Sequence, residues 1–139
     1  KLPFFKRSFI GVRPRYYPEK DWICFETDVT KLNSDKYGFQ FMMCMAKDEK
    51  VSIDHYQIID FSWSGQYNGD AYLIYIDIEA FYDRYRERMP FKSGDKVYIR
   101  AYPVNMSEGY GYLDTYLGVP QFSTLDRTRS TNVISFTMP

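Results

Sequence analysis

Histidine and cysteine are scarce in this 139-residue chain, which has one histidine and two cysteines. A four-ligand zinc site is difficult to assemble from so few side chains, and a disulfide-dense scaffold is excluded. His55 follows Asp54 in a polar stretch, without a serine or cysteine nucleophile in a recognisable motif. We therefore expect no metal, no cofactor and no enzymatic activity.

An excess of charge of one sign is also lacking, because 18 Lys and Arg residues balance 18 Asp and Glu residues. A neutral chain lacks the basic field that nonspecific binding to nucleic acids or anionic membranes requires. No apolar stretch approaches the roughly 18 residues of a membrane helix, so we expect no membrane insertion. Aromatic residues, by contrast, make up 19% of the chain. This content predicts a folded domain, and the length fits a single one.

Apolar and polar residues alternate with a period of two over most of the chain, which is the pattern of strands with one buried face. Turn-forming residues separate these segments. The alternating segments are residues 22–29, 39–45, 57–64, 72–78, 97–102 and 133–137. In the third segment, Ile59, Phe61 and Trp63 are expected to share the buried face. At least six short strands predict an all-β fold, a sandwich or barrel of antiparallel strands.

Two segments interrupt this pattern. The spacing of apolar residues near 79–89, with Pro90 after them, predicts a short helical insert. There Asp83 and Glu87 alternate with arginines, which favours a solvated face of ion pairs over a pair of catalytic carboxylates. The long loop 112–132 has no clean period, so we expect it to be functional or partly strand. Residues 1–8 form a basic lead, and residues 9–139 are assigned to one sandwich domain.

The segment Phe91-Lys-Ser-Gly-Asp-Lys-Val-Tyr-Ile-Arg-Ala-Tyr-Pro-Val-Asn105 resembles the fibronectin type III pattern L-x-P-G-T-x-Y-Y-V-R-A-Y-A-x-N. The variant that it resembles is common in surface proteins of Gram-negative gut bacteria. Residues 109–111 and 133–137 are similar to the Tyr-Gly pair and last strand of the same variant. The resemblance implies an immunoglobulin-like antiparallel sandwich of about seven strands, without catalytic activity, that serves as a spacer or binding module.

The chain departs from this family at its tyrosine corner. Val97 occupies the position of the family's first tyrosine, whose hydroxyl makes the hydrogen bond of the tyrosine corner. Valine cannot make this bond, and Tyr98 is expected to point to the opposite face. Strand parity also places Cys24 and Cys44 on outward faces. In the resembling fold the two strands belong to different sheets, which implies free thiols on opposite sides of the sandwich.

Aromatic residues and arginines supply the candidate binding residues, because Tyr and Arg are enriched at protein interfaces. An outward ladder on one strand and the long loop contribute most of them, and Trp22 is added as an outward-facing stacking platform. An alternative role for the ladder is to stabilise the sheet without a partner. The candidates are Tyr98, Arg100, Tyr102, Tyr112, Tyr116, Phe122, Arg127, Arg129 and Trp22.

These observations lead to two hypotheses of function. The first is a module that contacts a protein partner, a neighbouring subunit or a neighbouring domain in a surface-exposed or assembled structure. The resemblance implies an extracellular or cell-surface location, or a virion. The alternative is a carbohydrate-binding module whose exposed aromatics stack on the sugar rings of a glycan.

Overall fold

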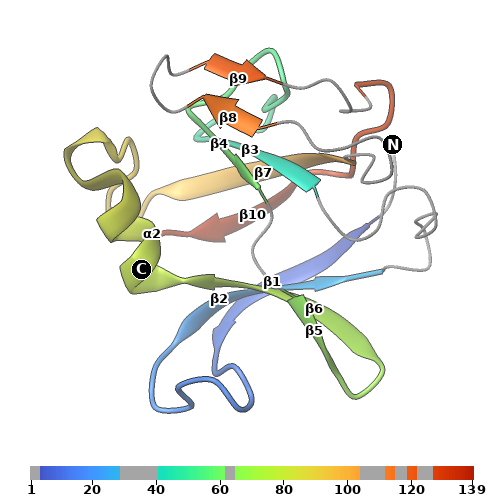
Figure 1. Ribbon diagram of the computed structural model, residues 1–139, viewed down its shortest axis with the longest axis vertical. Coiled ribbons are helices and arrows are strands. Elements are labelled where there is room, and N and C mark those ends of the chain that lie inside the picture. The colour runs from blue at the N-terminus through green and yellow to red at the C-terminus, as the bar shows by residue number, and fades with distance from the viewer. Residues whose placement is uncertain (1–3, 29–40, 62–64, 104–111, 115–118, 122–126) are drawn as a thin grey trace.

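Two antiparallel sheets of four strands each pack together as a sandwich (Figure 1). The computed structural model describes residues 4–28, 41–61, 65–103, 112–114, 119–121 and 127–139. The first sheet has the order β1 (Phe5–Gly11), β2 (Trp22–Thr27), β6 (Ala71–Asp77) and β5 (Gly65–Asn68). The second has the order β10 (Ile134–Thr137), β7 (Lys96–Pro103), β3 (Phe41–Ala46) and β4 (Ile58–Phe61). The predicted all-β sandwich is confirmed.

The core lies between the sheets and is filled by every second residue of their strands. Ile23 and Phe25 of β2 face Met43 and Met45 of β3 across it, as the alternation predicted. Val97 of β7 is fully buried there, while Tyr98 packs on the opposite side of its sheet. Both cysteines are free, and they are buried on the outer faces of different sheets, as expected. The period of two therefore determined which side chains build the core in these strands.

In β4 the expected parity is wrong. Ile58 lies opposite Met45 and joins the central core, whereas Ile59 lies opposite Cys44 and joins a cluster on the outer face. Apolar residues stand at both positions, so alternation alone could not choose between the two faces. The observed register turns Asp60 toward α2, where it is 6% exposed. Trp63 lies outside the described residues.

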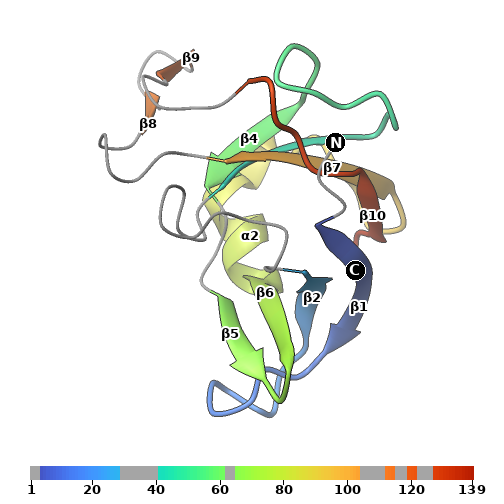
Figure 2. The same ribbon diagram turned by 90° about the vertical axis from the view of Figure 1, so that its right-hand side faces the viewer.

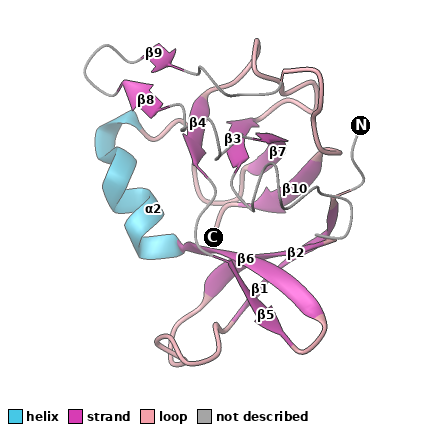
Figure 3. Cartoon of the chain, turned by 45° about the vertical axis from the view of Figure 1, so that its right-hand side comes forward, coloured by secondary structure: helices cyan, strands magenta, loops and turns pink. Residues whose placement is uncertain are grey.

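The predicted insert is a helix, α2 (Ile78–Tyr85), followed by a turn of 3₁₀ helix, η2 (Arg86–Arg88). Figure 3 shows α2 running alongside both sheets at one flank of the sandwich. Phe81 anchors the helix in the core. Asp60 of β4 accepts hydrogen bonds from Arg84 Nη1 at 2.9 Å and from the Tyr85 hydroxyl at 2.7 Å. Arg86 Nε lies 3.3 Å from the Asp83 carboxylate, an exposed ion pair of the predicted kind.

Three further elements lie where the sequence had suggested lead, turn or loop. Residues 5–8 of the basic lead belong to β1, and Phe4 and Phe5 are buried in the core. The Asn132 side chain accepts from Phe5 N at 2.8 Å and donates to Phe5 O at 2.9 Å, which ties β1 to the segment before β10. The strand β5 lies between the predicted segments 57–64 and 72–78, where turn-forming residues were expected. Within the predicted loop 112–132, β8 (Tyr112–Asp114) and β9 (Val119–Gln121) form a hairpin.

Candidate binding surfaces

The outer face of the second sheet was predicted to expose a patch around Tyr98, Arg100 and Tyr102. For Tyr102 this is wrong, because its side chain is only 4% exposed. The connection between β3 and β4 folds back over this face, and Ile53 N donates a hydrogen bond to the Tyr102 hydroxyl at 3.1 Å. Val51 is buried in the same cluster. Tyr102 therefore packs beneath the β3–β4 connection and stabilises it, and its side chain offers little surface to a partner.

Tyr98 and Arg100 remain accessible beside this cover. They line a hollow of about 450 Å³ between the turn after β3 and the start of β10. We call it the Arg100 hollow, and it is lined by Glu49, Lys50, Tyr98, Arg100, Val133, Ile134 and Ser135. Two of the three predicted ladder residues therefore do meet at one site.

Trp22 lies on the outward face of the first sheet, as its parity predicted, but the exposure expected for it is wrong. Only 5% of the residue is exposed, and it packs with Cys24, Leu73 and Tyr75. Since the indole is covered, it cannot serve as an open platform for sugar rings. The tryptophan instead forms the floor beneath the β1–β2 connection, residues 12–21.

The β1–β2 connection is held against this floor by two cations. The Arg13 guanidinium lies 4.2 Å from the ring centre of Tyr16 and 5.2 Å from that of Trp22. Its Nε also donates to Gln66 Oε1 on β5 at 3.0 Å, which links the connection to the β5–β6 hairpin. Such contacts between cations and aromatic faces each contribute roughly 0.5–2 kcal/mol.

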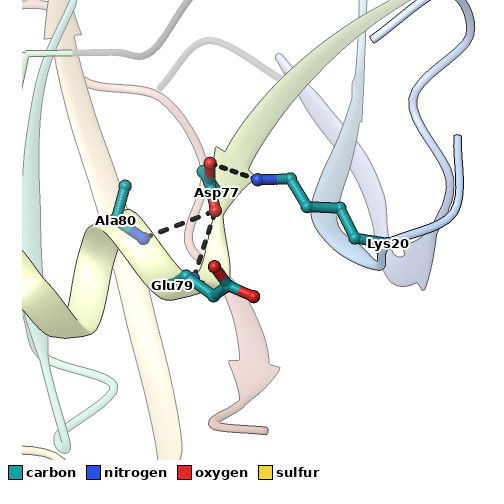
Figure 4. Close-up of polar contacts among 4 residues, drawn as sticks. All are labelled: Lys20, Asp77, Glu79 and Ala80. Atoms are coloured by element: carbon teal, nitrogen blue, oxygen red, sulfur yellow. Dashed lines mark hydrogen bonds and ion pairs between the residues drawn. The ribbon is translucent and has the colours of Figure 1, made fainter. Parts of the chain in front are cut away.

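The second cation, Lys20, joins the other end of the connection to the start of α2 (Figure 4). Its ammonium lies 4.7 Å from the ring centre of Trp22 and 2.6 Å from Asp77 Oδ2. The hydrogen bond to Asp77 outweighs partial desolvation and raises the pKa of Lys20. Burial pushes the pKa of Asp77 upward, but the bonds from Lys20 and from the helix N–H groups outweigh it and hold that pKa below its usual range.

All of the exposed large hydrophobic residues in the described ranges gather beside this connection. We call the set the aromatic end, and it comprises Ile10, Val12, Tyr16, Tyr17 and Tyr67. Figures 1 and 2 both place the β1–β2 connection and the β5–β6 turn at the same end of the molecule, away from the second sheet. A groove of about 570 Å³ runs between them, lined by Pro14, Arg15, Tyr16, Gln66, Tyr67, Asn68 and Gly69.

The backbone of the connection is in an unusual conformation at the aromatic end. Arg15 and Tyr17 have φ values of 69° and 46°, in the left-handed region that favours glycine. Each such residue costs on the order of 1 kcal/mol and persists only where the surroundings hold it. The contacts of Arg13 and Lys20 provide this support. The exposed tyrosines are thus presented on a fixed loop, which reduces the entropy lost when a ligand binds.

The long-loop candidates lie elsewhere, because the β8–β9 hairpin is at the opposite end of the molecule (Figure 2). Arg127 forms an exposed ion pair with Asp54 at 2.8 Å, and Arg129 is half-buried. Tyr112 begins β8. Tyr116 and Phe122 lie outside the described residues.

Sequence reasoning missed the aromatic end, although a signal for it was present. Two tyrosines stand between Pro14 and Pro18 in the string Arg13-Pro-Arg-Tyr-Tyr-Pro18. Prolines that flank adjacent aromatic residues indicate a constrained turn that displays them.

Several buried polar atoms have no hydrogen-bond partner in the described part of the chain: Trp22 Nε1, the Tyr75 hydroxyl and Arg100 Nε.

Burial raises the pKa of Cys24 to about 11 and that of Cys44 to about 12, so both remain thiols at neutral pH. Across the described ranges, no three histidine, cysteine or acidic side chains converge as a metal site. None of the helices there is long and apolar enough to span a bilayer.

A comparison of the chain with protein-family models, with curated proteins and with solved structures finds no match.

Proposed function

We propose that this protein is a non-catalytic β-sandwich module that binds a protein partner through the aromatic end. The observation that carries the proposal is that the exposed large hydrophobic residues of the described structure lie at one end of it, with Val12, Tyr16 and Tyr17 on the connection held by Arg13 and Lys20. Exposed apolar patches rimmed by polar groups mark protein interaction sites. Tyrosines and arginines are enriched in the residues that contribute most to such binding.

We further propose that the module is of the fibronectin type III or immunoglobulin-like kind. The strand order supports this proposal. Strands β1, β2, β6 and β5 correspond to A, B, E and D of that sandwich, and β3, β7 and β10 correspond to C, F and G. Strand β4 then extends the second sheet at its edge. The helix α2 is an insert between the E and F strands in this assignment.

The setting proposed for the module is the cell surface, the extracellular space or a virion, where its partner is a protein, a neighbouring subunit or a neighbouring domain. This part rests on the sequence resemblance of residues 91–105. The neutral charge of the chain supports a partner other than nucleic acid.

Partner capture with matched variants tests the proposal. The wild-type protein, the double variant Tyr16→Ser/Tyr67→Ser and the control Arg88→Ala are immobilised and exposed to extract from the native source. Arg88 is exposed on η2, remote in the fold from the aromatic end. We expect one partner to be retained by wild type and control and lost by the double variant. A partner retained equally by all three proteins contradicts the assignment of the aromatic end.

A second candidate function is glycan binding, and the groove at the aromatic end favours it. Tyr16 and Tyr67 offer faces for stacking on sugar rings, while Arg15 and Asn68 offer hydrogen-bond donors. Gln66 contributes less, because its side chain already bonds Arg13 and the Pro14 carbonyl. A glycan array and intrinsic fluorescence titrations with polysaccharides test this function. Silence in both experiments dismisses it and leaves the protein partner.

A further inference from the structure

The edge strands of the two large sheets differ in how they are covered. Strands β1 and β10 lie side by side, where the Asn132 side chain bonds the backbone of Phe5 and Ser8 Oγ donates to the β10 backbone at 2.6 Å. The edge strand β4 has α2 beside it and is joined to the helix through Asp60. Strand β5 is the remaining edge, and none of the described elements lies along its open side (Figure 2).

The turn after β5 determines which backbone groups of the strand face the open side. This two-residue loop has Gly69 at its first position with a φ of 67°, which is typical of a type II′ turn. The residue before such a loop, here Asn68, is hydrogen-bonded to the opposite strand, and bonded residues alternate along an antiparallel pair. Gln66 is therefore bonded to β6, whereas the N–H and C=O groups of Gly65 and Tyr67 point away from β6.

Most of the features that prevent edge strands from pairing are missing from β5. The strand, Gly65–Asn68, contains no charged residue and no proline. Its hydrogen bonds with the β1–β2 connection are made by the Gln66 side chain, so they leave the outward backbone groups of Gly65 and Tyr67 open. The one restraint is its length of four residues, which limits how much of a partner it can pair with.

Two tyrosine rings stand beside this open backbone. The Tyr72 ring lies over Gly65, where a Cβ atom would come within 2.5 Å of Tyr72 Cε1. The Tyr67 ring meets Tyr72 edge to face, with 5.1 Å between the ring centres, and Tyr67 is 59% exposed. A strand that pairs with β5 would therefore contact aromatic surface as well as backbone donors and acceptors.

The sequence of β5 is complementary to itself. In an antiparallel pair with its twofold axis at Gln66, Gly65 of each copy lies opposite Tyr67 of the other. The outward N–H and C=O groups of both residues then form hydrogen bonds between the copies. Because Gly65 has no side chain, Tyr67 of one copy can pack against the Tyr72 ring of the other. The formal charge of zero adds no net repulsion between two copies of the chain.

We propose that this protein forms a reversible homodimer in which β5 pairs antiparallel with β5 of a second copy. The pairing joins the first sheets of the two copies, of four strands each, into one continuous sheet. Since a strand of four residues gives a small interface, the dimer is in exchange with the monomer. Tyr67 also belongs to the aromatic end, but the dimer does not depend on the proposed partner.

Sedimentation velocity and residue-resolved hydrogen exchange by NMR test the proposal on the purified chain. Between about 10 µM and about 1 mM, the mass should rise from 16.6 kDa toward twice that value. The amides of Gly65 and Tyr67 should exchange quickly in the dilute protein and slowly in the concentrated protein. Those of Gln66 and Asn68 should be protected at both concentrations, because they bond β6. This alternation distinguishes strand pairing from nonspecific contact of apolar side chains.

Two lysine variants of equal charge locate the interface. Tyr67→Lys places two like charges near the twofold axis, so it should weaken the dimer at least about tenfold. Val12→Lys makes the same change in charge at an exposed residue just after β1, the opposite edge of the sheet, and should dimerise as wild type does. Circular dichroism checks that both variants are folded. Tyr16→Ser should also leave the dimer intact.

Three results overturn the proposal. They are a mass of 16.6 kDa at every concentration, equal weakening by Tyr67→Lys and Val12→Lys, and a dimer in which the Gly65 and Tyr67 amides still exchange quickly. The proposed function fails separately, since loss of partner capture in wild type with an intact dimer would contradict only the partner role of the aromatic end.

Discussion

Replacing Asp77 separates the two tasks of one carboxylate at the junction of β6 and α2. Its Oδ1 accepts from Glu79 N at 3.1 Å and from Ala80 N at 3.4 Å, which caps the helix. Its Oδ2 holds Lys20 at 2.6 Å and so fixes the β1–β2 connection (Figure 4). Asp77→Ala removes both contacts. Asp77→Asn keeps a good cap through its Oδ1 but places a donor NH2 group against Lys20, so it removes the ion pair and its hydrogen bond while leaving the cap.

The loss of the cap in Asp77→Ala should lower the free energy of unfolding by about 1–2 kcal/mol. For a chain of this length, that corresponds to a fall in melting temperature of roughly 3–8 °C. Asp77→Asn should lose less stability. Urea unfolding followed by tryptophan fluorescence measures all three proteins, with buried Trp22 as one reporter.

The difference in free energy of unfolding between wild type and Asp77→Asn should depend on pH, because the pKa of Asp77 is lowered in the folded protein. A carboxyl group whose pKa is lower in the folded state adds stability above its unfolded pKa and loses it as the pH falls through the folded value. Wild type should therefore exceed Asp77→Asn in free energy of unfolding by the largest amount near pH 7, and this difference should shrink as the pH falls into the acid range. Equal losses in Asp77→Ala and Asp77→Asn, or no loss in Asp77→Ala, refute the capping role.

Two further predictions concern buried groups. Tyr85→Phe should lower the free energy of unfolding by about 1–2 kcal/mol, because Asp60 loses a hydrogen-bond donor. Tyr82→Phe on the same helix removes only an exposed hydrogen bond to the terminal Pro139 carbonyl, so it should lower the free energy of unfolding by less. Urea unfolding compares the two variants, and an equal loss of stability in both would contradict the role of the buried bond between Tyr85 and Asp60. Since burial raises the pKa of both Cys24 and Cys44, neither thiol should react with Ellman's reagent at about pH 8 in the native protein. Both should react in denaturant, and rapid labelling without denaturant would contradict the burial.

Strand parity predicted the sandwich because it needs only the local alternation of side chains. It correctly predicted that Phe25 and Met43 lie in the core and that both cysteines point to the outer faces. It failed in β4, where Ile58 and Ile59 satisfy either register. Contacts with α2 decide the outcome there, because the register that buries Asp60 gives it Arg84 and Tyr85 as partners.

Exposure was harder to predict than the direction in which a side chain points. Trp22 and Tyr102 both point away from the core, yet the β1–β2 connection covers Trp22 and the β3–β4 connection covers Tyr102. Parity carries no information about whether a loop folds back over an outer face. The β1–β2 connection that covers Trp22 also carries the exposed Tyr16 and Tyr17. The candidate site therefore lies on this connection and not on a strand.

Hydrogen exchange of the protein with and without its captured partner tests the binding role of the aromatic end most directly. We predict that the partner slows exchange in residues 12–20 and 65–70, while the helical segment 78–88 exchanges as in the free protein. Protection confined to the helical segment or to the β8–β9 hairpin, with residues 12–20 unchanged, would contradict it.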